Sequence, residues 1–115
     1  MRTRTATPPA DEALLRLLGL GYRAGTVVVG VDAVRAGLQD GRFACVVLAG
    51  DASPRAHEKV VRLAVAKGIP LYAGPPAETI GARLGKPAVM VVGVQDRALA
   101  QGIAKASPAK APREA

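Results

Sequence analysis

The sequence predicts an α/β fold, a three-layer α/β/α sandwich built on a small mixed sheet of about four strands. Amphipathic helical segments and short apolar runs alternate along most of the chain, and this alternation places helices on both faces of a mostly parallel or mixed sheet. Two of the runs, Phe43–Ala49 and Ala88–Val94, are too continuous to have one face in water, which indicates strands covered on both sides. With 115 residues, 50% of them hydrophobic, the chain can bury the core of one compact domain.

The first half of the chain predicts two helices and two strands. Asp11 can cap a first helix, whose leucines follow at once. Thr26–Val29 is a short strand between two glycines. An amphipathic helix then begins at Val31 and ends near Gly41, and Phe43–Ala49 is the first long strand.

The second half predicts three further helices and two strands. Pro54 opens a clear helix that ends at Lys67, where a basic last turn is followed by a glycine. The remaining elements are a strand at Ile69–Ala73, a helix at Ala77–Leu84, a strand at Ala88–Val94 and a helix over about 97–105 that Asp96 can cap.

Much of the positive charge lies in the two ends of the chain. Residues 1–10 and 105–115 are rich in Ala, Pro, Thr and Ser, which predicts flexible basic tails around a single domain at 11–104. The net charge is +7, which favours a polyanionic partner and salt-dependent affinity for a phosphate backbone. The alternative is that basic tails only keep the protein soluble.

Composition excludes several classes of function. Aromatic residues make up 3% of the chain, too few for a surface that stacks single-stranded bases. The one cysteine, Cys45, can form neither an intrachain disulfide nor a Cys-rich zinc site, and is most simply a small core residue. No apolar run approaches the roughly 20 residues of a membrane span, and no apolar signal core follows the N-terminal arginines. We therefore expect a soluble cytoplasmic protein with no membrane partner.

The sequence offers no convincing catalytic motif. The glycine-rich segments 19–25 and 81–86 have the wrong spacing and context for nucleotide-binding loops. Asp51, Ser53 and His57 follow a strand, where open α/β sheets place ligand sites, but Ser53 or Asp51 is better explained as a helix cap. We expect no enzymatic activity, no catalytic residue, no metal and no small-molecule cofactor.

Five basic residues fall at the ends of elements, next to glycines: Arg23, Arg35, Arg42, Arg83 and Lys86. A glycine lets the backbone approach a phosphate or base edge closely, and a neighbouring cation can then neutralise the charge. The alternative is that these glycines serve only as turns and helix caps.

Several segments occur together in order: Arg23–Gly30, the helix from Val31, Leu48–Asp51 with Ser53-Pro54, Ile69–Tyr72, Ile80-Gly81, Leu84–Lys86 and Asp96. Together they resemble the ribosomal L7Ae/L30e superfamily of kink-turn RNA-binding proteins, especially its short bacterial YlxQ-like branch. The likeness covers about residues 12–104. It implies a ribosomal L30e-like α/β/α fold and non-enzymatic binding of structured RNA in ribosomal or RNA-processing particles.

The resemblance also implies a binding site. In RNA-binding members, the glycine that opens the second helix and the polar residues after it contact sheared G·A pairs, and an apolar loop before the last strand covers an extruded base. Gly30 matches that glycine. Asp32 and Ala33 stand where the family has Asn-Glu, and Ala36 replaces its lysine, with Arg35 adjacent.

The expected RNA-binding residues are Arg23, Gly25, Gly30, Asp32, Arg35, Arg42, Arg83, Lys86, Ala88 and Val89. The expected partners are structured RNA, ribosomal or otherwise kink-turn-like, and ribosomal proteins. An alternative is a protein-interaction module on the same fold with RNA binding weakened or lost, which Ala33 and Ala36 favour. A third class, a detached recognition piece of an RNA-modifying enzyme, would have to lack a cofactor-binding domain, since the chain is too short for one.

Overall fold

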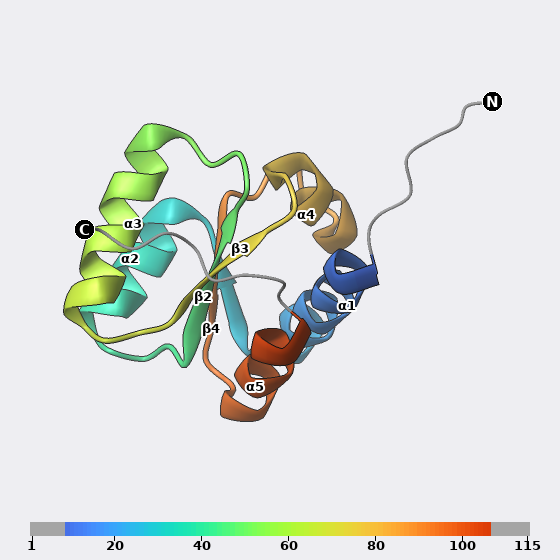
Figure 1. Cartoon of the computed structure of the whole chain (residues 1–115), viewed down its shortest axis with the longest axis horizontal. Coiled ribbons are helices and arrows are strands. Elements are labelled where there is room, and N and C mark those ends of the chain that lie inside the picture. Colours follow the sequence, from blue (N-terminus) through green and yellow to red (C-terminus); the bar gives the residue numbers. More distant parts are fainter. Residues whose placement is uncertain (1–8, 107–115) are drawn as a thin grey trace.

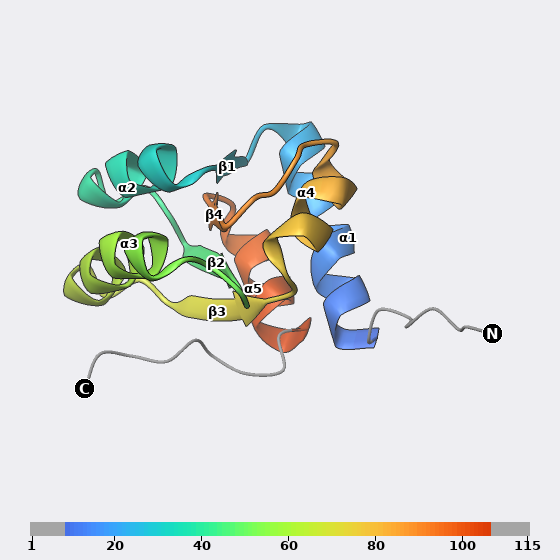
Figure 2. The same cartoon turned by 90° about the horizontal axis from the view of Figure 1, so that it is seen from above.

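The structure, a computed structural model, describes residues 9–106 and has the predicted three layers (Figure 1). Within these residues the helices are α1 (Pro9–Ala24), α2 (Val31–Gln39), α3 (Pro54–Ala66), α4 (Ala77–Leu84) and α5 (Arg97–Ala106). The strands are β1 (Val27–Val29), β2 (Cys45–Ala49), β3 (Leu71–Gly74) and β4 (Val91–Val94). Helices α2 and α3 cover one face of the sheet and α1, α4 and α5 the other, as Figure 2 shows from above. The predicted α/β/α fold is confirmed.

The four strands form one mixed sheet in the order β1-β4-β2-β3. Strand β4 is antiparallel to both of its neighbours, and β2 is parallel to β3. Strands β1, β2 and β3 therefore run in the same direction. Their last residues, Val29, Ala49 and Gly74, lie at one edge with Val91 at the start of β4. We call this the carboxyl edge, and α2, α3 and α4 all begin there.

Each face of the sheet packs its own core cluster. Val47 of β2 enters the cluster under α1, α4 and α5, whereas Val46 and Leu48 enter the cluster under α2 and α3. This division follows because successive side chains of a strand point to opposite faces. Every residue of β2 is buried, so the prediction of a strand covered on both sides is confirmed.

Strand β4 is shorter than its apolar run. It begins at Val91, whereas the run begins at Ala88. The residues before it are held against α4 instead, where the Val89 N–H donates to the Ala77 carbonyl at 3.0 Å. Their apolar character therefore comes from packing in a loop and not from a strand.

Polar side chains accept hydrogen bonds from the first turns of three of the helices. The Ser53 hydroxyl accepts from the Ala56 N–H at 3.1 Å and caps α3, as predicted. An Asp96 oxygen accepts from the third N–H of α5 at 3.1 Å. Asp51 is also a cap, but of α4 and not of the nearer α3, because its Oδ1 accepts from the Ala77 N–H at 2.8 Å. This last bond ties the β2–α3 loop to the β3–α4 turn.

Helix α1 begins at Pro9 and α5 ends at Ala106, each two residues outside the range of 11–104 predicted for the single domain. The rest of the two predicted tails, 1–8 and 107–115, lies outside the described residues. Within residues 9–106, no helix has the length and apolar character needed to cross a bilayer.

Candidate nucleic-acid interface

Gly30 forms an open corner of the molecule at the carboxyl edge. Its backbone has φ +103° and ψ 148°, a conformation that residues with side chains rarely adopt. A Cβ placed there would meet no atom of the described residues within 4 Å, its chain neighbours aside. Gly30 is the N-cap of α2 and no side chain caps that helix, so the first N–H groups of α2 remain available to an outside acceptor. We call Gly30 and residues 31–33 the Gly30 corner.

The loop between α4 and β4, residues 85–90, reaches the sheet beside this corner. The Gly30 N–H donates to the carbonyl of Val91, directly after the loop, at 3.0 Å. The loop lies so close to α4 that a Cβ on Gly81 would overlap the Pro87 carbonyl. At its end, the Met90 carbonyl accepts from a β2 N–H at 2.7 Å. These contacts fix the position of the loop relative to Gly30.

Residues 85–88 of this loop are exposed, whereas Val89 is only 4% exposed and belongs to the core. The expectation that Val89 offers an apolar outer surface is therefore wrong, because its side chain packs in the core cluster on the α4 side of the sheet. Lys86, Pro87 and Ala88 line a hollow of about 620 Å³. The other residues around this hollow are Asp51, Ala77, Glu78, Ala82 and Met90.

Three of the expected cations gather over the second half of α1. The Lys86 ammonium lies 5.8 Å from the centre of the Tyr22 ring, within range of a cation–π contact. Arg23 and Arg83 both pass beside Gly19, within 3.8 and 4.0 Å of where its Cβ would be. The α4–β4 loop thus brings positive charge from α4 onto α1.

Arg83 is already engaged in this group. Its Nη2 donates to both carboxylate oxygens of Glu12, each at 3.0 Å, and joins α4 to α1. This bond holds the pKa of the Glu12 carboxyl below its usual range. Within the described residues, Arg23 and Lys86 form no such ion pair. Of the three cations over α1, these two therefore remain available to an outside anion.

Two expected residues lie away from the Gly30 corner. Arg42 stands between α2 and β2, at the opposite edge of the sheet, and pairs with Asp40 at 3.7 Å. Gly25 and Arg23 both precede β1, whereas Gly30 follows it. Arg42 and Gly25 are therefore not part of the Gly30 corner, and Arg23 belongs to the group of cations over α1.

Asp32 and Arg35 are exposed on α2. Asp32 lines a hollow of about 180 Å³ at the start of α2 and α3, and this hollow also includes Arg55 and Lys59 of α3. Arg55 and Lys59 were not among the residues predicted from the sequence. Their spacing of four residues places them on one side of α3, but an ordinary solvated helix face shows the same spacing.

Ser53 and Asp51, which the sequence offered as candidates for catalysis, have structural roles in the described part of the chain. No group of three His, Cys, Asp or Glu side chains in residues 9–106 could hold a metal ion. The Ser53 hydroxyl is used as a helix cap. Cys45 is 1% exposed, and burial raises the pKa of its thiol to about 12.

The fold and this edge define a class of protein: a small α/β/α domain with an uncapped helix start and an adjoining loop at one edge of its sheet, and with cations over its first helix. Residues 12–102 match the model of the ribosomal protein L7Ae/L30e/S12e/Gadd45 family. The chain belongs to this family, which confirms the resemblance found in the sequence. No curated protein matches the chain.

The solved structures that are similar to the chain include the following two. A protein of unknown function from Bacillus halodurans C is 28% identical with a TM-score of 0.76, over 81% of this chain and 94% of that one. A Giardia lamblia 15.5kD RNA-binding protein is 19% identical with a TM-score of 0.74, over 88% of this chain and 87% of that one. The second likeness is one of fold.

Proposed function

We propose that this protein is a non-enzymatic RNA-binding protein that recognises structured, kink-turn-like RNA. The observation that supports this most directly is the Gly30 corner, an uncapped helix start that no described side chain covers. Membership of the L7Ae/L30e/S12e/Gadd45 family supports RNA as the class of partner, and the RNA-binding protein from Giardia lamblia has the same fold.

In this proposal, the Gly30 corner contacts the RNA through its backbone. The free N–H groups of the first turn of α2 donate to phosphate or base oxygens, and the positive end of the helix dipole favours those anions. The Asp32 carboxylate accepts from a guanine amino group. Such contacts depend on the shape of a folded RNA, which suits a chain with few aromatic residues.

The α4–β4 loop supplies the second part of the proposed interface. Pro87 and Ala88 offer a small apolar surface to a base that leaves the stack, while Lys86 and Arg23 neutralise phosphates on the side of α1. Arg83 holds the two helices together and contributes indirectly. Val89, Arg42 and Gly25 are left out of the proposed interface, the first because it is buried and the others because of their place in the fold.

We further propose that the target is ribosomal or ribosome-associated RNA in the cytoplasm, with ribosomal proteins as neighbours. The family to which the chain belongs includes ribosomal proteins. No reaction is assigned, since Ser53 and Asp51 are engaged as caps and the Cys45 thiol is buried.

A second candidate is a protein-interaction module. Ala33 and Ala36 are small, uncharged and exposed on α2, next to the residues that would contact RNA. A helix face of this kind lets a partner protein approach closely, and it offers fewer polar contacts to a nucleic acid.

The test compares two RNA hairpins by fluorescence anisotropy. One contains a kink-turn, and in the other the sheared G·A pairs are replaced by Watson–Crick pairs. We expect the wild-type protein to prefer the kink-turn by about tenfold or more, and Asp32→Ala to reduce that preference by about tenfold, since a specific base contact contributes about 1–3 kcal/mol.

The matched control is Asp40→Ala, which removes the same charge from the other end of α2 and should leave the preference unchanged. Equal binding of the two hairpins by the wild-type protein would contradict kink-turn recognition. Failure to bind either hairpin, together with capture of a ribosomal protein by the same sample, would favour the second candidate.

A further inference from the structure

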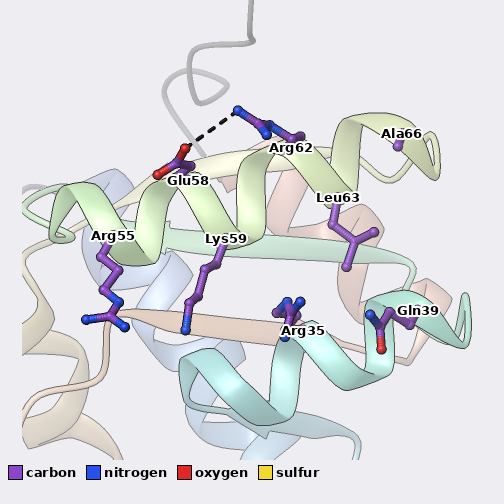
Figure 3. Close-up of a pocket in the computed structure, with 8 residues that line it drawn as sticks. All are labelled: Arg35, Gln39, Arg55, Glu58, Lys59, Arg62, Leu63 and Ala66. Atoms are coloured by element: carbon purple, nitrogen blue, oxygen red, sulfur yellow. Dashed lines mark ion pairs between the residues drawn. The ribbon is translucent and has the colours of Figure 1, made fainter.

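A groove of about 570 Å³ runs between α2 and α3, on the face of the sheet away from α1. Figure 3 shows Arg55 and Lys59 of α3 reaching into this groove toward α2, with Arg35 on the α2 side. Leu63 and Ala66 of α3 supply its apolar part. Neither the Gly30 corner nor the α4–β4 loop includes these residues.

The cations of this groove outnumber its acids. The residues around it include three arginines and a lysine against one carboxylate, that of Glu58. Glu58 is paired with Arg62 at 3.6 Å along α3, and Figure 3 shows this pair outside the space between the helices. Within residues 9–106, Arg35, Arg55 and Lys59 form no ion pair. Their charges are therefore available to an outside anion.

One end of the groove lies beside a bridge between the two helices, and the other end lies beside the Gly30 corner. At the C-terminal end of α2, Lys67 donates to the Gln39 carbonyl at 3.2 Å and bridges the two helices. At the other end, Arg55 and Lys59 also line the small hollow that contains Asp32. Met90 lines that hollow and the one beside the α4–β4 loop as well. These shared residues place the three hollows next to one another, from the loop, past the Gly30 corner, to the groove.

We propose that this groove binds the phosphate backbone of an RNA stem that continues from the motif seated on the Gly30 corner. The inference rests on the proposed function and extends it to a second contact region. Arg55 and Lys59 would neutralise successive phosphates nearest the corner, and Arg35 would do so further along the groove.

The spacing of these groups suits a charged backbone. Arg55 and Lys59 are four residues apart, about 6 Å along α3, and the arginine side chain can donate two parallel hydrogen bonds to a phosphate. Asp32 at the entrance would repel phosphate, and the two α3 cations beside it offset that charge. Contacts of this kind position an RNA without reading its sequence.

The position of the groove beside the Gly30 corner favours RNA over an acidic protein as the occupant. An RNA held at the Gly30 corner must continue in some direction, and the cationic groove begins beside that corner. An acidic segment of another protein would gain nothing from this placement.

The test uses the full chain and three RNAs: a minimal kink-turn, and the same kink-turn with about ten base pairs added to one stem or to the other. We expect the wild-type protein to bind one extended RNA at least tenfold more tightly than the minimal one. The double variant Arg55→Gln with Lys59→Gln should lose that gain, while its affinity for the minimal RNA stays within about threefold of the wild type.

The matched control is Arg97→Gln with Lys105→Gln, which removes the same charge from α5, on the opposite face of the sheet. It should keep the gain from the added stem, and thermal unfolding of both variants should match the wild type. If the wild-type protein does not bind the minimal kink-turn, the proposed function itself fails.

Three results would overturn the groove proposal alone. In the first, neither added stem increases the affinity. In the second, both double variants lose the gain equally, so that only total charge matters. In the third, RNA affinities do not change, but a peptide rich in Asp and Glu binds the wild-type protein and not the α3 variant, which would assign the groove to a protein partner.

Discussion

Gly81 is the residue on which the position of the α4–β4 loop most depends. It lies inside α4, where glycine costs about 1 kcal/mol relative to alanine, and any Cβ there would overlap the backbone of Pro87. We predict that Gly81→Ala destabilises the protein despite the better helix propensity of alanine, and that it weakens RNA binding because the loop moves away from Gly30. Urea unfolding and the anisotropy assay measure the two effects.

Gly19 provides the matched control for this substitution. It also lies inside a helix, but a Cβ there would contact only flexible parts of Arg23 and Arg83 at 3.8 and 4.0 Å. Gly19→Ala should therefore increase the free energy of unfolding by about 0.5–1 kcal/mol. If the two alanine variants were equally stable, close packing of the loop on α4 would be wrong.

The thiol of Cys45 offers a second test at the scale of one residue. Burial raises its pKa to about 12, so the folded protein keeps the thiol protonated over the range in which an exposed cysteine ionises. We predict that a thiol reagent labels the native protein slowly at pH 8–9.5, with little increase as the pH rises, and labels it at once in urea. In this range only the thiol of the unfolded protein ionises, and this ionisation stabilises the unfolded state. The contribution of Cys45 to the free energy of unfolding therefore decreases as the pH rises above about 9. Fast labelling of the native protein would show that β2 is not covered on both sides.

At the scale of the elements, one cap connects two segments that are far apart in the sequence. Asp51 follows β2 but caps α4 through the Ala77 N–H, so it holds the start of α4 against the carboxyl edge. We predict that Asp51→Ala lowers the free energy of unfolding by about 1 kcal/mol, the usual cost of losing an N-cap. Chemical denaturation measures this loss.

Asp40→Ala is also the control for the Asp51→Ala variant. It breaks only an exposed ion pair with Arg42 at 3.7 Å, and such pairs contribute about 0–1 kcal/mol. A loss of the same size in both variants would mean that the Asp51 bond contributes no more than an exposed charge.

The elements also show what the sequence could predict. Helix α4 was predicted with the bounds it has, because its apolar spacing, the preceding prolines and the following glycine all agree. The ends of the strands were less predictable. An apolar residue such as Val89 can belong to a strand or pack in a loop beside α4, and the sequence pattern is the same in both cases. That Asp51 caps α4 could not be predicted, because the contact depends on β2 and β3 being neighbours.

The residues of the candidate site were also predictable only in part. Gly30 and Lys86 were found from glycines next to charges and from the family resemblance. The contribution of Arg55 and Lys59 depends on α2 and α3 packing side by side (Figure 1). Nothing local to α3 distinguishes these residues from an ordinary solvated helix face until the groove is seen.

At the scale of the whole molecule, charge is divided between the folded domain and the ends of the chain. Residues 1–8 and 107–115 include the cations Arg2, Arg4, Lys110 and Arg113, beside the one acid Glu114. Cations that contact phosphates release counterions, so each contact changes the slope of log affinity against log salt concentration by about 0.7–0.9. In the proposed function, specific contacts at the Gly30 corner would add to the affinity for the correct RNA without depending on the ends of the chain.

We therefore predict that replacing Arg2, Arg4, Lys110 and Arg113 by Gln in the full chain has two separable effects. Affinity for both hairpins should fall together and the salt slope should become shallower, while the ratio of the two affinities stays within about twofold of the wild type. A titration of each hairpin at several salt concentrations measures slope and ratio at once. Should the ratio collapse while the slope stays unchanged, discrimination would reside in the ends of the chain, and the Gly30 corner could not be the surface that recognises the RNA.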